Sequence, residues 1–202
     1  MMSRPGTFER IYAALRDRLR TGHYRPGNRL EPAILSDELN ASVTPIRDAL
    51  HRLTGERLVE APPHEGFRVP VMTETTLRHL FAWHRDLLLL AVANRRVTGA
   101  GDPHTTVVRP ATADDRLTSL FVDLAGATGN PEHVLAVLAI IERIEPLRRL
   151  EAKLLDAIDS EADEILDAFS CADRHRLRAA LLRYHRRRLR IVPRLLDQIQ
   201  RD

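Results

Sequence analysis

The stretch SVTPIRDALHRLTGERLVEAPPHEGFRV, residues 42–69, joins one amphipathic helix directly to one small hairpin. Ser42 suits the N-cap of the helix, because its hydroxyl can accept a hydrogen bond from a first-turn amide. Pro45 falls in that first turn, where a missing N–H is tolerated. Ile46 and Leu50 recur at helical spacing and predict an inward face. The hairpin follows after one short turn, so the helix and the hairpin must lie next to each other in the fold.

Two more helices are expected before residue 42. Residues 7–21 carry apolar side chains at helical spacing, namely Phe8, Ile11, Tyr12, Leu15 and Leu19. A short helix over residues 32–39 should follow, and Asn40 can adopt the left-handed conformation that a tight turn between helices needs. Two helices joined by a four-residue turn are the layout of helix-turn-helix DNA recognition, and the hairpin adds a wing.

Side chains that face away from the apolar side of these helices are candidates for DNA contacts. Arg47 can donate two hydrogen bonds to a guanine edge or bind a phosphate. At the hairpin tip, His64 and the backbone of Gly66 can reach the sugar-phosphate backbone or the minor groove. The helix and the wing therefore predict two DNA-reading elements on one support.

Residues 7–70, including GHYRPGNRLEPAILSDELNASVTPIRDALHRLTGERLVEAPPHEGFRV, resemble the winged helix of GntR-type bacterial transcription regulators. The resemblance implies DNA contacts for Ser42, Thr44, Arg47, His64 and Gly66. Helix and hairpin geometry adds Arg52 and Arg68 to that set. Val43 and Glu65 depart from the family pattern, which has arginine at both positions. Each change removes a cation that would bind a phosphate or base, and Glu65 adds a repulsive charge.

The rest of the chain predicts helices, over residues 73–96, 112–127, 131–155, 158–170 and 173–200. A loop rich in Gly, Pro and Thr separates the first two of them, at 97–111. GNP at 129–131 separates the helices expected over 112–127 and 131–155. Pro146 should kink or split its helix. The expected fold is mainly α, with a winged helix-turn-helix domain over residues 1–72 and an antiparallel helical bundle over residues 73–202.

The helical part resembles the effector domain of the FadR-type branch, which often holds a divalent metal through one Asp and three His. The GNP anchor and the segment ADEILDAFSCADRHRLRAALLRYH place the four ligand positions on Leu117, Phe121, Ala162 and Tyr184. Apolar side chains cannot bind a metal, and a protonated phenol is a poor ligand. We therefore predict no metal in the effector cavity and no other cofactor.

Polar residues remain on the inward stripes of these helices. Arg188 shares a helix face with Leu177, Leu181, Tyr184, Ile191 and Leu195, and His84 lies between Phe81 and Leu88. A buried arginine needs an anionic partner. That partner could be an internal carboxylate such as Asp123, Glu142 or Glu145. Alternatively, the side chain could reach solvent, or a carboxylate-bearing effector could bind to His84, Tyr184 and Arg188.

Composition sets the outer limits of the function. The net charge of +3 is mild, and no apolar run approaches the roughly 20 residues that span a bilayer. The N-terminus lacks the apolar core of an export signal, and Cys171 has no second cysteine to pair with. We expect a cytoplasmic protein that is not attached to a membrane.

Among function classes, an enzyme is disfavoured, because the sequence holds no Gly-rich phosphate loop and no nucleophile motif. The favoured function is a homodimeric regulator, a repressor in family terms, that reads an inverted repeat in a double-stranded DNA operator and responds to a small organic acid. The alternative is an adaptor protein on a degenerate regulator fold, which Val43 and Glu65 would explain.

Overall fold

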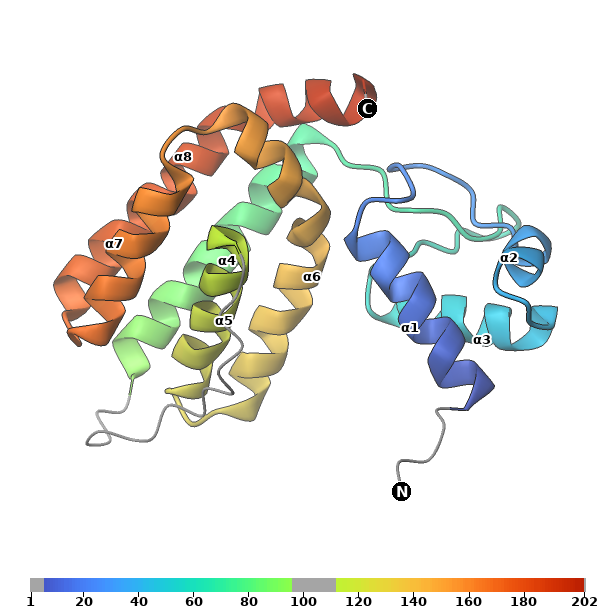
Figure 1. The fold of residues 1–202 in the computed structure, drawn as a ribbon, viewed down its shortest axis with the longest axis horizontal. Helices are drawn as coiled ribbons and strands as arrows, with labels where there is room; N and C mark the ends of the chain where they lie inside the picture. The colour runs from blue at the N-terminus through green and yellow to red at the C-terminus, as the bar shows by residue number, and fades with distance from the viewer. Residues whose placement is uncertain (1–5, 96–111, 202) are drawn as a thin grey trace.

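A computed structural model describes residues 6–95 and 112–201, so the loop predicted at 97–111 lies outside the described residues. The described part holds eight helices and is mainly α (Figure 1). Their bounds are α1 Thr7–Arg20, α2 Pro32–Glu38, α3 Val43–Gly55, α4 Glu74–Asn94, α5 Ala113–Gly126, α6 Pro131–Leu154, α7 Ile158–Ser170 and α8 Arg174–Arg201. The helix predictions are confirmed to within two residues at each end.

The first three helices enclose a small hydrophobic core. Ile11 and Leu15 of α1 meet Ile46 and Leu50 of α3 there, and all four are fully buried. Asn40, in the turn between α2 and α3, has φ 48°, as the tight turn required. The amphipathic pattern of the sequence therefore identified both the core face of each helix and the turn that joins them.

The hairpin after α3 is less regular than predicted. Within the described residues, its pairing is limited to isolated antiparallel bridges of Arg68 with Glu60 and with Arg29. Glu60 and Arg68 exchange both backbone hydrogen bonds, at 2.8 and 2.9 Å. Three prolines among residues 62–70 lack the N–H that a longer ladder needs. The prediction of true strands was wrong, although the two sides of the wing do pair.

The remaining five helices form a bundle around a second hydrophobic core, which extends from Leu77 to Leu195. α4 and α8 run antiparallel, since contacts at one end join Arg78 to the Leu189 carbonyl and contacts at the other join the Arg95 carbonyl to Arg174. The boundary at residues 72/73 stays a prediction, but the two cores are separate sets of residues.

Two prolines lie inside the long helices of the bundle. Pro146 does not split α6, which continues from Pro131 to Leu154. Pro193 lies inside α8, and Figure 1 shows the last part of this helix turning away from its first part. Proline removes one backbone hydrogen bond and crowds the preceding turn, which permits such a bend.

The winged helix contacts the bundle through α1 and α6, which lie side by side in Figure 1. Arg16 Nε lies 3.3 Å from Glu142 Oε2, and Arg20 Nη1 lies 3.7 Å from Glu145 Oε1. Two of the carboxylates considered as partners for the buried Arg188 therefore serve the interface between the two parts instead.

Candidate nucleic-acid interface

The N-terminal half of α3 presents an open polar face. Ser42 takes the N-cap position predicted for it, but its side chain makes no capping hydrogen bond. Thr44, in the first turn, and Arg47, in the second, are exposed. Within residues 6–95 and 112–201, Arg47 has no hydrogen bond or ion pair. A hydroxyl pair and an unpaired guanidinium are thus available to a ligand at the start of this helix.

The C-terminal half of α3 is fixed to α1. The guanidinium of Arg52 lies over the ring of Tyr12, with its central carbon 4.1 Å from the ring centroid, and its Nε lies 3.3 Å from Glu56. Tyr12 donates its hydroxyl proton to the same carboxylate at 2.7 Å. Arg52 is exposed but engaged, so its DNA contact stays a prediction that would require it to leave these partners.

The tip of the wing is a tight turn. His64 and Gly66 both have positive φ, 64° and 77°, and both are exposed. His51 of α3 packs edge-on against Phe67 on the returning side, with 4.9 Å between ring centroids. This contact ties the orientation of the wing to that of α3, as two elements that read one ligand require.

The base of the wing is largely neutralised. Arg68 Nε lies 2.9 Å from Glu60 Oε2, and its Nη1 lies 2.9 Å from Glu65 Oε2. Glu65 therefore removes a cation in two ways: it replaces the arginine of the family pattern, and it pairs with a neighbouring one. The predicted DNA contact of Arg68 is untested and has to compete with both carboxylates.

Arg29 was not predicted, and the structure adds it to this surface. It pairs with Arg68 through the backbone, and its side chain is exposed. Within the described ranges it has no ion pair or hydrogen bond through its side chain. The only sequence signal was a basic residue after the Pro-Gly turn at 26–27, which does not specify proximity to the wing.

A second polar group lies inside the bundle, around Arg188. This side chain is fully buried and forms ion pairs with Glu151 and Glu161, both at 2.8 Å. Its guanidinium also covers the Tyr184 ring at 3.3 Å from the centroid. Burial lowers the pKa of Arg188, but Tyr184, Glu151 and Glu161 together outweigh burial and raise it. The arginine has internal carboxylate partners, although not the three residues that the sequence suggested.

His84 and His185 face each other beside this group, with His84 Nδ1 3.1 Å from His185 Nε2. His185 Nδ1 lies 2.8 Å from the Leu181 carbonyl and must donate to it. A neutral His185 then accepts through Nε2, so His84 donates through Nδ1. Burial lowers the pKa of His185 to about 3 and that of His84 well below its ordinary value. Both rings are therefore neutral, and His84 Nε2 has no partner within the described residues.

The four positions that correspond to family metal ligands are all buried in the bundle, as their inward spacing predicted: Leu117, Phe121, Ala162 and Tyr184. Phe121 and Tyr184 lie against each other, with 5.6 Å between ring centroids. In the part of the chain that the structure describes, no group of three or more His, Cys, Asp or Glu side chains could hold a metal ion. The four positions that the resemblance assigns to metal ligands are filled by packing residues.

The predicted effector residues do come together. His84 contacts His185, and Tyr184 contacts both His185 and Arg188. However, Arg188 already has two carboxylates, so an incoming acid would have to displace one of them. Effector binding at this cluster stays a prediction.

Within residues 6–95 and 112–201, each helix is too short or too polar to cross a lipid bilayer. A winged helix with an open recognition face, joined to an all-helical bundle, defines a two-part regulator of the DNA-binding type. Residues 7–69 match the family model described as bacterial regulatory proteins, gntR family. The N-terminal part of the chain is therefore similar to the gntR family over these residues, and it is joined to an all-helical C-terminal part. The description of this family model is one of regulatory proteins.

Individual relatives agree with this assignment. The chain is 34% identical over 79 residues to the HTH-type transcriptional regulator McbR of Escherichia coli, and 33% identical over 100 residues to the HTH-type transcriptional repressor GlaR of the same organism. These alignments cover 39% and 50% of this chain and 36% and 46% of the relatives. The chain thus spans less than half the length of the curated relatives it matches.

Solved structures extend the likeness of fold to nearly the whole chain. E. coli McbR/YncC superposes with a TM-score of 0.65 at 18% identity, covering 95% of this chain and 99% of the other. A transcriptional regulator GntR from Rhodococcus sp. RHA1 superposes with a TM-score of 0.68 at 20% identity, covering 94% and 97%. At these identities the comparison establishes the fold alone.

Proposed function

We propose that this protein is a sequence-specific, DNA-binding transcription regulator that represses its targets as a homodimer and responds to a small organic acid. The observation that carries the proposal is the start of α3, where Arg47 and Thr44 are exposed and Arg47 has no partner within the described residues. An arginine in this position can form a bidentate contact with guanine in the major groove. Repression is supported by GlaR, whose name describes a transcriptional repressor.

Homodimer formation is supported by large apolar side chains that are exposed on two helices of the bundle. Trp83 and Leu90 of α4 are 54% and 52% exposed, and Leu135 of α6 is 57% exposed. Trp83 and Leu90 are seven residues apart and share one side of α4, which packs against α6. Large apolar side chains clustered on a surface mark interaction sites. A second copy on this surface would present two winged helices to the two halves of an inverted repeat.

Fluorescence anisotropy tests the proposal directly. Labelled DNA from the region upstream of the protein's own gene is titrated with the full chain, at two salt concentrations and with competitor DNA present. Arg47→Ala should weaken specific binding at least about tenfold, the loss expected for one bidentate base contact. Arg178→Ala is the matched control, since Arg178 is an exposed arginine on α8, far along the chain from the recognition helix.

Equal, weak binding of every sequence, including after selection from random DNA, would refute the regulator. The adaptor alternative would then lead. It is favoured by one specific observation: Val43 and Glu65 stand where the family pattern has cations, and Glu65 additionally pairs with Arg68 at 2.9 Å.

A further inference from the structure

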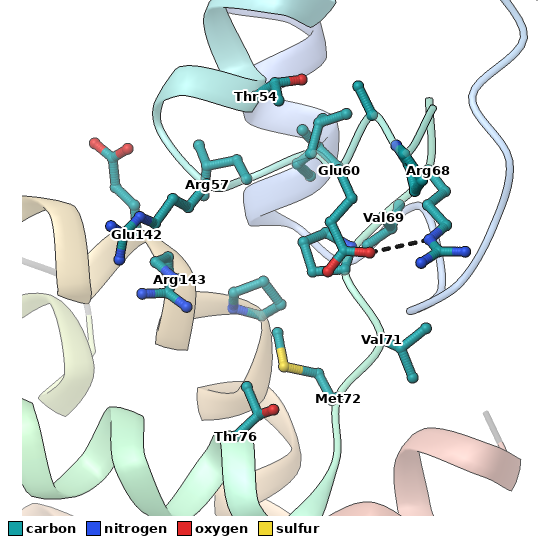
Figure 2. Close-up of a pocket in the computed structure, with 17 residues that line it drawn as sticks. Thr54, Arg57, Glu60, Arg68, Val69, Val71, Met72, Thr76, Glu142 and Arg143 are labelled. Atoms are coloured by element: carbon teal, nitrogen blue, oxygen red, sulfur yellow. Dashed lines mark hydrogen bonds and ion pairs between the residues drawn. The ribbon is translucent and has the colours of Figure 1, made fainter. Parts of the chain in front are cut away.

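A cavity of about 660 Å³ lies between the winged helix and the bundle. Its upper wall is the end of α3 and the base of the wing, including Thr54 and Val69, and its lower wall is formed by α6 and the start of α4, including Thr76 (Figure 2). A ligand in this cavity would touch both parts of the protein at once.

Two arginines face each other across the cavity. Arg57 follows α3, and Arg143 lies on α6; Figure 2 shows the Arg57 side chain extending across to α6, near Arg143. Arg143 is half-buried, and both its burial and the charge of Arg57 lower the pKa of its guanidinium. Two like charges held this way repel each other unless an anion lies between them.

The acidic residues of the cavity do not supply that anion. Glu142 is directed to α1, where it pairs with Arg16, and Glu60 pairs with Arg68 at 2.9 Å, the contact drawn in Figure 2. Throughout residues 6–95 and 112–201, neither Arg57 nor Arg143 has an ion pair or a hydrogen bond through its side chain. Both guanidinium groups therefore retain their full capacity to bind a carboxylate.

The backbone at Arg57 does not require an arginine. Its φ of 61° lies in the left-handed region, where glycine is the favoured residue. The Arg57 amide bonds to the Thr54 carbonyl and the Leu58 amide to the Leu53 carbonyl, both at 3.0 Å, as at helix ends that usually carry glycine. An unfavourable residue held in such a conformation points to a role for its side chain.

The rest of the cavity wall is mainly apolar, from Leu19, Leu58, Val59, Met72 and Pro146. Ligand sites in proteins combine such walls with a few convergent polar groups. We propose that this cavity binds a small organic carboxylate with an apolar body, with the carboxylate held between Arg57 and Arg143 and the body against the apolar wall.

The consequence of binding follows from the position of the cavity. The ligand would join the end of the recognition helix and the base of the wing to α6, and so stabilise one orientation of the winged helix relative to the bundle. In a homodimer, that orientation sets the distance between the two winged helices. Ligand binding would therefore change the affinity of the protein for DNA. Only this consequence rests on the proposed DNA-binding function; the site itself does not.

Isothermal titration calorimetry of the full chain tests the site without DNA. The probes are benzoate and hexanoate, with benzyl alcohol as a neutral compound of similar shape. We expect both carboxylates to bind and the alcohol to bind at least about tenfold more weakly. Arg57→Gly and Arg143→Gln should each weaken carboxylate binding about tenfold or more, whereas Arg178→Gln should leave it unchanged. Arg57→Gly suits the left-handed backbone, so loss of binding in this variant cannot be attributed to unfolding.

Absence of binding by both carboxylates, or binding that neither cavity variant weakens, would overturn the proposal. The anisotropy assay then separates site from function. Carboxylate binding that depends on Arg57 and Arg143, in a protein that reads no DNA sequence, would support the site and refute the regulator. Specific DNA binding without carboxylate binding would refute the site and leave the regulator intact.

Discussion

Acidification should destabilise the bundle through the buried pair of His84 and His185. Both rings are neutral in the folded protein, and His185 donates to the Leu181 carbonyl while accepting from His84. A proton added to either ring would enter a site that is buried from solvent, close to Arg188 and without a protein acceptor for His84 Nε2 among the described residues. The unfolded chain accepts the same proton in water at no such cost.

The size of the effect follows from the two pKa values of His185, about 3 when folded against an ordinary 6.5. Because the folded value is the lower one, the unfolded chain binds more protons between them, so stability is complete above the unfolded pKa and falls with pH below it. Going from about pH 7 to about pH 5 removes about 2 kcal/mol for such a histidine. The pKa of His84 is lowered well below its ordinary value too, so this histidine contributes to the loss in the same direction.

Urea unfolding, followed by circular dichroism at both pH values, measures this loss. The comparison protein is the double variant His84→Leu with His185→Leu, since replacing both partners by apolar residues of similar size leaves no unpaired donor. Burial raises the pKa of Asp123, which acts in the opposite direction on acidification but equally in both proteins. The double variant should lose at least about 2 kcal/mol less than the natural protein. An equal loss in the two proteins would refute the assignment of neutral, buried histidines.

Three further predictions concern other contacts. Glu161→Gln should lower the free energy of unfolding by about 3–5 kcal/mol, because it leaves Arg188 partly unpaired in the core, and an unchanged urea midpoint would contradict the buried ion pair. Glu65→Arg should raise DNA affinity and steepen its salt dependence, since it adds a cation and releases Arg68; anisotropy at several salt concentrations would detect an unchanged slope. Leu135→Asp should shift the proposed homodimer to monomer in sedimentation, and a dimer of undiminished affinity would place the interface elsewhere.

Local features of the fold were predictable from the sequence because their causes are local. Helix faces follow from the spacing of apolar residues, the turn at Asn40 from its tolerance of positive φ, and the recognition face from what remains exposed on α3. The wing was predicted in place but not in detail, since the prolines that interrupt its pairing left only single bridges. Even there, the deviation has a cause that lies within a few residues.

Partnerships between distant residues were decided only by the tertiary structure. Arg188 was expected to find a carboxylate, yet periodicity could not select Glu151 and Glu161, because the choice depends on how α6 and α7 register against α8. The pairing of His84 with His185 spans 101 residues and depends in the same way on the antiparallel packing of α4 and α8.

The sequence by itself thus determined the elements, their buried faces and the DNA-reading class of the N-terminal part, because each of these follows from neighbours along the chain. The tertiary structure alone decided which charges meet. Arg57 and Arg143 are unremarkable residues in separate helical segments until the two parts of the protein pack and bring both guanidinium groups into one cavity. Charge is a property of each residue, but the distance between two charges is a property of the fold.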